Sequence, residues 1–388
     1  MWIQAMKLRS DSIVLSVILL GIAGCFTSST PPPIVIGHVS DATRLDKAGY
    51  QAELGIRLAL HELSQDSTFA EAFGARKIEV HHTDAGGNLD KMESQAVRLD
   101  SLQRCLALFG GLSVAETGAL NHAKVPLLTF HGQPAPGADN QVFYLGMSPS
   151  QQGAVLAQFV AEDAKAIQIT LLMDERRAEA LALAESFQKT LARVRQGKGA
   201  QPKVYLIRFG GDARWSELID RMNAQEPHSI VFAGTVQDFN AWRKAFVREF
   251  LTSDPQVVYG GSDGDQRLFD VDGDAKSAVI LASTLDLDPA SAKVQAFKKS
   301  FKEAFQSEPE ADVHAALAYD GFRMLADAMK RTSTQLTPER LRDELLKTKD
   351  LPGLTGALSI NADRVIQRPL FVVRWQDRVV TPVKAYAP

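Results

Sequence analysis

The sequence predicts an α/β protein made of two doubly wound lobes, each built on a parallel sheet. From Pro33 onward, short apolar segments alternate with longer segments whose apolar residues recur at helical spacing. This alternation is typical of a parallel sheet with helices on both faces. It starts again near Ser148, which indicates a second lobe. A chain of 388 residues, 45% of them hydrophobic, is also long enough to bury two cores.

The first run begins with a short apolar strand, IVIGHV, over 34–39. A helix is expected over 48–63, because Leu54 and Leu58 fall on one helical face. The segment KIEVHH alternates in character, which predicts a strand. The other elements expected in this run are a helix over 89–102, buried strands over 105–109 and 125–130, and a short helix from about Ala115.

The second run and the C-terminal part continue the alternation. Strands are expected over 167–173, 204–209, 229–232, 256–259 and 277–283, and helices over 151–164, 178–194, 214–224 and 237–250. Long helices then fill 292–305, 311–329 and 338–346, and the chain closes with strands over 358–360 and 370–375. Two doubly wound sheets in one chain leave a cleft between them, where ligands commonly bind.

Composition excludes several classes of function. The formal net charge is −3 and no basic runs occur, so nothing points to nucleic-acid binding. No CxxC or HExxH motif occurs, and His81 and His82 are expected on a strand, where neighbours point to opposite faces. This pair therefore predicts no metal site, and no cofactor is expected. Cys105, within LQRCL, is typical of a small buried hydrophobic residue.

The N-terminus has the pattern of a secretory signal. Lys7 and Arg9 precede an apolar run over 13–22, which is shorter than the ~20 residues that span a bilayer. The run ends in IAGC, which resembles a bacterial lipobox, so residues 1–24 are expected to be removed and Cys25 to carry the lipid. An ordinary signal peptide with an accidental cysteine, or an uncleaved anchor, is the alternative.

Residues 25–33 (CFTSSTPPP) are too polar and proline-rich to pack, which predicts a flexible tether to a membrane. Removal of residues 1–24 leaves a net charge of −4. With Cys25 lipidated, Cys105 has no disulfide partner. The expected location is the cell envelope, on the periplasmic or extracellular face.

The order of segments resembles the type 1 periplasmic binding proteins, above all the branched-chain amino-acid-binding (Leu/Ile/Val) proteins of ABC importers. The resemblance rests on IVIGHVS, YQAELGIRLALHEL, KIEVHHTDAGGNLDK, LFGGLS, VPLLTF, VFYLGMSPSQQGAVLAQFV, SIVFAGTVQDF, VVYGGSDG, VQAFKKSFKEAF, ALAYDGFRMLADAM and LPGLTGALSIN. It implies two discontinuous lobes joined by a hinge, the first over 34–147 and 284–357, the second over 148–283 and 358–388. It also implies an ABC permease as partner and capture of a small solute by hinge closure.

The resemblance implies first-lobe ligand contacts in two loops. In the first, Ser113 offers a hydroxyl and the amides of Val114 and Ala115 open a helix, where a carboxylate is favoured. The family usually has this hydroxyl one place later, at Val114. In the second, His131, Gly132 and Gln133 follow a strand, with Gln133 in place of the family's hydroxyl and His131 supplying a carbonyl. The alternatives are a glycine-rich turn without ligand and a solvated loop histidine.

On the second-lobe side, the resemblance makes Asp263 the partner of a ligand ammonium, through a charge-assisted hydrogen bond. A helix cap is the alternative role for Asp263.

The expected aromatic walls of the pocket are missing from this sequence. Ala178 and Thr235 stand where the family tends to carry tyrosines, and Ala48 where it carries a first-lobe aromatic residue, with Tyr50 two places on. His314 is expected to replace another aromatic residue of the pocket, or to lie on a helix surface. Because these rings would enclose the side chain of an amino acid, a different small polar ligand fits the sequence as well.

Two other functions remain open at this level. Residues 260–264 (GGSDG) match the nucleophile-elbow pattern GxSxG after a strand, and His314 lies downstream, as in a serine hydrolase. Asp263, however, places a carboxylate beside Ser262, where it disfavours a developing oxyanion. No catalytic residue is therefore expected. The same fold also serves ligand sensors and regulators of envelope enzymes.

Overall fold

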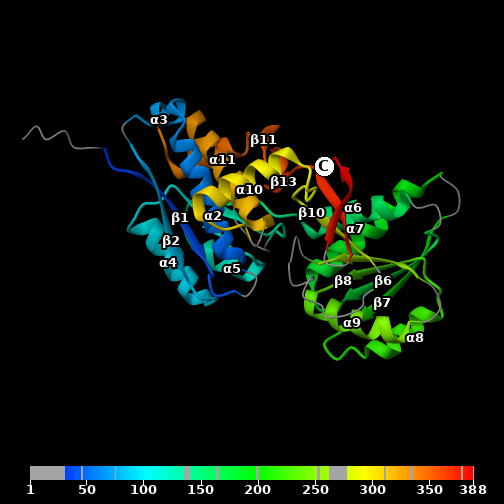
Figure 1. Cartoon of the computed structure of the whole chain (residues 1–388). Coiled ribbons are helices and arrows are strands. Elements are labelled where there is room, and N and C mark those ends of the chain that lie inside the picture. Colours follow the sequence, from blue (N-terminus) through cyan, green and yellow to red (C-terminus); the bar gives the residue numbers. More distant parts are fainter. Residues whose placement is uncertain are drawn as a thin grey trace, which may run out of the picture.

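The computed structural model describes residues 31–44, 47–74, 76–134, 140–162, 166–197, 201–250, 254–261, 278–309, 312–332, 335–376 and 379–387. Cys25 and the predicted signal segment lie outside these ranges, as do Ser262 and Asp263. The described part folds into two α/β lobes that lie side by side (Figure 1), which confirms the predicted fold class. No helix in the described ranges is both long and apolar enough to cross a membrane.

The first lobe contains a five-stranded parallel sheet in the order β2–β1–β3–β4–β5. Its strands are β1 (Ile34–Ser40), β2 (Ile78–Asp84), β3 (Ala107–Gly110), β4 (Leu127–Thr129) and β5 (Val142–Tyr144). Side chains alternate across this sheet, as strand geometry requires. Ile36 and Phe109 enter one core, whereas Val39 and Leu108 enter the core on the opposite face.

Helices cover both faces of the first sheet. One face packs against α2 (Ala48–Ser64), α3 (Ser67–Ala72), α11 (Asp312–Thr332) and α12 (Pro338–Leu345). The other face packs against α4 (Leu89–Ser101) and α5 (Val114–Leu120). Helix α10 (Ala292–Phe305) packs outside α2 and α11 through Phe297 and Phe301. Residues far apart in the sequence therefore share one core, which makes this lobe discontinuous.

The second lobe contains a seven-stranded sheet in the order β15–β14–β10–β9–β8–β6–β7. Its strands are β6 (Gln168–Asp174), β7 (Lys203–Phe209), β8 (Ser229–Ala233), β9 (Gln256–Gly260), β10 (Val279–Ser283), β14 (Leu370–Gln376) and β15 (Val379–Tyr386). The first five are parallel, while β14 and β15 form an antiparallel edge. Helices α6 (Pro149–Glu162) and α7 (Ala178–Arg195) cover one face, and α8 (Trp215–Asn223) and α9 (Val236–Glu249) cover the other.

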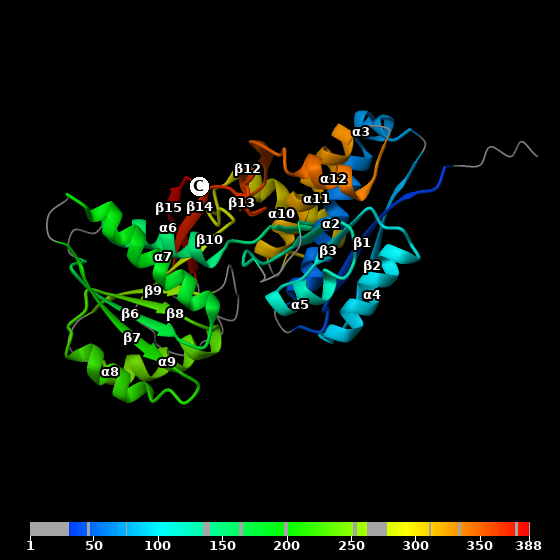
Figure 2. The same ribbon diagram turned by 180° about the vertical axis from the view of Figure 1, so that it is seen from behind.

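A small third sheet lies where the lobes meet. It consists of β11 (Leu351–Gly353), β12 (Gly356–Ile360) and β13 (Ile366–Gln367). Figure 2 shows β12 and β13 on the side of the first lobe that borders the second. Leu358 and Ile366 pack into the first-lobe core, and Val365 pairs with Tyr144 at the end of β5. Residues 358–367 thus pack with the first lobe, whereas the sequence analysis assigned them to the second.

The chain passes between the lobes after β5, after β10 and after β13. Buried polar groups fasten two of these passages together. Arg368 donates to the Leu145 carbonyl at 2.5 Å and to the Thr355 hydroxyl at 2.8 Å. Asp320, on α11, accepts from the Leu354 and Thr355 amides at 2.7 and 2.8 Å. Because these groups are almost completely buried, they hold the junction in one arrangement.

Candidate ligand-binding site

A pocket of about 310 Å³ opens at the carboxyl ends of the second-lobe strands. Its walls come from the starts of α6, α7 and α9 and from the end of β9, and Leu112 of the first lobe also lines it. Ligands of open α/β sheets bind at this edge, because the loops that follow parallel strands meet there. A volume near 300 Å³ is in the range of small-molecule sites.

The start of α7 contributes opposite charges to the pocket wall. Arg177 and Glu179 both line it, and their side chains are 46% and 37% exposed. Arg177 Nη2 lies 3.8 Å from Glu179 Oε2, which is a weak pairing in solvent. These residues flank Ala178, the position where an aromatic wall was expected. Neither Arg177 nor Glu179 was predicted from the sequence as a site residue, although both are direct neighbours of Ala178, which was expected in the pocket wall.

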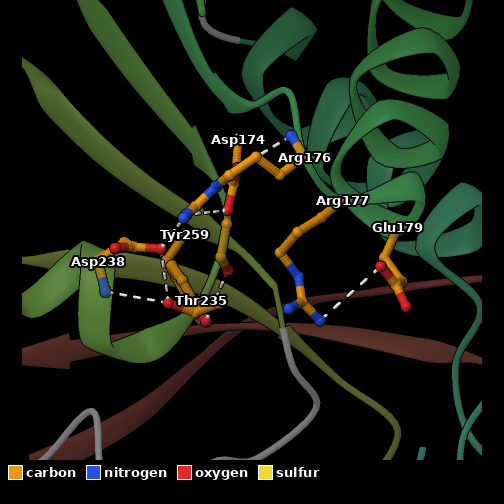
Figure 3. A network of polar contacts seen from close by, with 8 residues as sticks. Asp174, Arg176, Arg177, Glu179, Thr235, Asp238 and Tyr259 are labelled. Carbon is orange, nitrogen blue, oxygen red and sulfur yellow. Dashed lines mark hydrogen bonds and ion pairs between the residues drawn. The ribbon is translucent and has the colours of Figure 1, made fainter. Parts of the chain in front are cut away.

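A second polar network supports the opposite side of the pocket (Figure 3). Arg176 binds both carboxylate oxygens of the fully buried Asp174, through Nε and Nη2, at 2.8 Å each. Burial alone raises the pKa of Asp174, but the hydrogen bonds from Arg176 outweigh it and hold that pKa below its usual value. Arg176 also reaches Asp238 at 3.3 Å. The network therefore joins the end of β6 to the start of α9.

Thr235 lies in the pocket wall, and its hydroxyl also caps a helix. Thr235 Oγ1 accepts from the Asp238 amide at 3.0 Å and donates to Asp238 Oδ2 at 2.9 Å. An N-cap threonine satisfies an otherwise unpaired amide of the first helical turn. Nearby, the buried Tyr259 donates to the Gly234 carbonyl at 3.3 Å and lines the base of the pocket.

Ser113 caps α5, and its hydroxyl accepts from the Glu116 amide at 3.3 Å. Val114 and Ala115 form the first turn of that helix. Glu116 turns back to accept from the Leu112 amide at 2.8 Å and lies 3.6 Å from Arg44. A carboxylate of the protein itself therefore stands at this helix N-terminus, where a ligand carboxylate was expected. Of this loop, Leu112 is the residue that lines the pocket.

His131 is held inside a chain of hydrogen bonds. Its Nδ1 accepts from the Gln133 amide at 3.1 Å, so Nε2 carries the proton and donates to Thr117 Oγ1 at 2.7 Å. Thr117 pairs with Thr129, which donates to the Gly111 carbonyl. Burial lowers the pKa of His131 to about 4, so the ring is neutral at pH 7. His131 is therefore not a solvated loop histidine, since its ring joins the first two predicted loops.

Gly132 lies against the passage from β5 to α6. A Cβ atom there would stand 2.2 Å from the Met147 carbonyl carbon, so only glycine fits. Gln133 follows and is partly buried. These residues are placed at the junction of the lobes, and they are not among the residues that line the pocket.

The remaining candidates lie elsewhere or outside the described residues. His314 is in the first turn of α11, in the first lobe, and does not line the pocket. Asp263 and Ser262 lie outside the described residues, directly beyond Gly261 at the pocket edge. Cys105 is buried, as predicted, and burial raises its pKa to about 12. A thiol of that pKa is inert as a nucleophile at pH 7.

Residues 33–379 match the sequence model of the family described as periplasmic binding protein. Among solved structures, a leucine-binding protein from Thermotoga maritima is similar, with 21% identity, a TM-score of 0.70, and coverage of 92% of this chain and 99% of that one. The branched-chain amino-acid transporter substrate-binding protein LivJ from Streptococcus pneumoniae, in complex with isoleucine, has 20% identity, a TM-score of 0.70, and coverage of 92% and 100%.

A solute-binding protein of an ABC transporter from Rhodopseudomonas palustris, in complex with 3,4-dihydroxybenzoic acid, has 17% identity, a TM-score of 0.70, and coverage of 92% and 97%. Comparison with curated proteins gives no match. The two-lobed architecture and a family match over nearly the whole chain agree, and this chain therefore belongs to the periplasmic binding protein family, with the type 1 fold.

Proposed function

We propose that this protein is the solute-binding component of an ABC importer and captures an amino acid or a similar small polar solute. Family membership and the pocket at the strand ends of the second lobe support this proposal. Leu112 brings the first lobe to the rim of the pocket, so a solute that touches both lobes favours the closed arrangement. A binding protein of this kind carries out no chemical reaction.

The observation that carries the proposal is the charge pair Arg177 and Glu179 in the pocket wall. A planar guanidinium suits a carboxylate, which it can bind through two parallel hydrogen bonds. Isoleucine and 3,4-dihydroxybenzoic acid, the solutes of two similar structures, both carry a carboxyl group. We therefore assign the solute carboxylate to Arg177, and a solute ammonium to Glu179 together with Asp263.

The first lobe then contacts the rest of the solute. Because Glu116 already occupies the N-terminus of α5, this end disfavours a second carboxylate and favours a neutral acceptor group of the solute, such as a hydroxyl or carbonyl oxygen. Ser113, the amides of Val114 and Ala115, and the backbone of His131, Gly132 and Gln133 remain our candidates there, with Thr235 opposite them. His314 also stays in the predicted set and, like the other first-lobe candidates, does not line the pocket.

Binding measured on the purified protein tests this function. Isothermal titration with single amino acids and with aromatic carboxylic acids is expected to identify at least one solute that also compacts the protein in X-ray scattering. Arg177→Gln is expected to lower the affinity for that solute at least tenfold, which corresponds to about 1.4 kcal/mol of binding free energy. Glu179→Gln distinguishes amino acids from aromatic carboxylic acids. It is expected to weaken binding of a solute with an ammonium group and to leave binding of a solute without one unchanged.

Arg214→Gln is the matched control, since Arg214 is an exposed arginine of the same lobe whose ion pair with Glu217 lies outside the pocket lining. If no carboxylate-bearing solute binds, or if Arg177→Gln and Arg214→Gln behave alike, the proposed recognition is wrong.

We also propose that the mature protein is held to a membrane by a lipid on Cys25. A tether over 25–33 keeps the pocket near a membrane permease at raised effective concentration. Mass spectrometry of the N-terminal peptide is expected to find a diacylglyceryl group on Cys25. If Cys25 carries no lipid, or is not the first residue of the mature protein, the proposed lipid anchor is wrong.

A further inference from the structure

Three side chains with metal-binding chemistry meet in the first lobe, away from the residues that line the pocket. His38 on β1 and His82 on β2 are register partners, and their Nδ1 atoms lie 3.0 Å apart. Glu53 on α2 approaches from the adjoining layer, with Oε2 4.0 Å from His82 Nδ1. One potential ligand atom from each residue lies within 4.8 Å of the others.

The spacing fits a single bound ion. Nitrogen ligands of zinc lie about 2.0–2.1 Å from the metal, so two of them at tetrahedral or octahedral angles are about 3 Å apart. The two Nδ1 atoms already have this separation. Glu53 Oε2 is farther away, 4.0 Å from His82 Nδ1, so its side chain has to approach the two nitrogens when an ion binds.

Arg57 orients the third ligand. Its guanidinium binds Glu53 Oε1 at 2.5 Å, one helical turn away, which leaves Oε2 on the side of His82. Outer groups of this kind are typical of metal sites, because they fix the direction of the ligand atom. The positive charge of Arg57 acts on both rings and opposes a bound cation, so the ion must gain its affinity from the two nitrogens and the Glu53 oxygen.

The burial of His38 is the independent observation. The ring is completely buried, and its Nε2 has no hydrogen-bond partner among the described residues. It is held by packing, including edge contact with Phe130, and by its contact with His82. Burial fixes the ring with Nδ1 directed at His82, whereas Nε2 points elsewhere and stays unpaired with or without an ion at Nδ1. Burial also lowers the pKa of His38 and His82, which keeps both rings neutral.

We propose that His38, Glu53 and His82 bind a divalent transition metal ion, with Zn²⁺ as the best match, in the first lobe. Neutral imidazoles with one carboxylate favour Zn²⁺ over Ca²⁺ or Mg²⁺, which prefer sets of oxygen ligands. The bound ion links β1, β2 and α2 and stabilises the lobe in which solute contacts are proposed. This role does not depend on the identity of the solute.

Zinc titration of the purified full-length protein, after treatment with a chelator, tests the site. The wild-type protein is expected to bind one Zn²⁺ per chain and to unfold at a higher temperature when zinc is present. Glu53→Gln and His82→Gln are expected to lower zinc affinity by more than about 10–100-fold, the range found when groups that only orient a metal ligand are removed.

His81→Gln is the matched control, because its ring lies on the opposite face of β2, against Gln103. Replacement of zinc by Co²⁺ adds a direct readout on the wild-type protein, whose visible absorption is expected to indicate nitrogen ligation even if a variant fails to fold. If the wild-type protein binds no stoichiometric metal, if Co²⁺ shows no nitrogen ligation, or if His81→Gln loses as much affinity as His82→Gln, the site does not exist.

Discussion

At the scale of single residues, His131 explains why the two first-lobe loops stay together. Its ring bridges the Gln133 amide and the Thr117 hydroxyl, and Thr129 passes the chain on to the Gly111 carbonyl. Because the Gln133 amide donates to Nδ1, the hydrogen bonds run in one direction, from His131 Nε2 through Thr117 and Thr129 to the Gly111 carbonyl. Ordered chains of this kind are stronger together than as separate bonds.

This arrangement predicts acid sensitivity. The pKa of His131 is about 4 in the folded protein and near 6.5 when unfolded, so the unfolded state binds more protons between these values. Its contribution to stability, of order 3 kcal/mol, is complete above pH 6.5 and is lost as the pH falls towards 4. His131→Gln is expected to unfold more easily at pH 7.5 and to lose less stability on acidification.

Urea unfolding at pH 7.5, 6 and 5 measures both effects. His122→Gln is the control, since that histidine side chain is 54% exposed and lies beside Glu93. Equal pH dependence in His131→Gln and the wild-type protein would contradict the role assigned to the ring.

At the scale of elements, the long helices and buried strands were predicted correctly, because their periodicity is strong. Helix α10 has the predicted bounds, 292–305, and α7 ends within one residue of its prediction. Four elements were missed because six residues or fewer carry too little periodicity: α3, β5, β11 and β13. Strand β15 was missed because it is an exposed edge strand whose Pro382, beside a register shift, argues against a strand in the sequence.

The network of Asp174, Arg176 and Asp238, which joins the end of β6 to the start of α9, leads to a prediction about the stability of the second lobe. Arg176→Met removes both side-chain donors of the fully buried Asp174 carboxylate and leaves the backbone amide of residue 176, which donates to Asp174 Oδ1 at 3.1 Å. Because Arg176 is 47% exposed and solvent can enter, we expect a loss of stability smaller than for a fully buried pair and larger than for an exposed one. Thermal and urea unfolding measure it.

Arg177→Met, one residue on, is the matched control, since its ion pair with Glu179 is exposed and contributes at most about 1 kcal/mol. Similar losses in the two variants would show that Asp174 does not depend on Arg176.

At the scale of the whole molecule, the junction determines how the lobes can move. Arg368 binds Leu145 on one passage and Thr355 on the first-lobe side of another, so one side chain fastens segments more than 200 residues apart. Bending between the lobes must therefore occur around this buried cluster, rather than through it.

Arg368→Lys and Arg368→Met test the junction. Lysine can keep one of the two contacts, whereas methionine keeps neither and leaves the Asp320 network short of a cation. We expect the unfolding temperature to fall in the order wild type, lysine, methionine, with a loss of about 2–4 kcal/mol for methionine. X-ray scattering is expected to show a broader distribution of sizes for the methionine variant.

Arg374→Met, an exposed position on β14, is the control for loss of an arginine near the same edge. If Arg368→Met is as stable as Arg374→Met, Arg368 does not stabilise the junction between the lobes.

The sequence by itself determined the α/β class, the two lobes and the pocket edge, because periodicity and the order of segments are local properties that survive without coordinates. Tertiary structure alone decided which groups meet across distant segments. His38 meets His82 and Glu53, Arg368 meets Leu145, and Glu116 occupies the helix end expected to hold a ligand. Such contacts depend on register and on packing between layers, and no spacing along the chain encodes them.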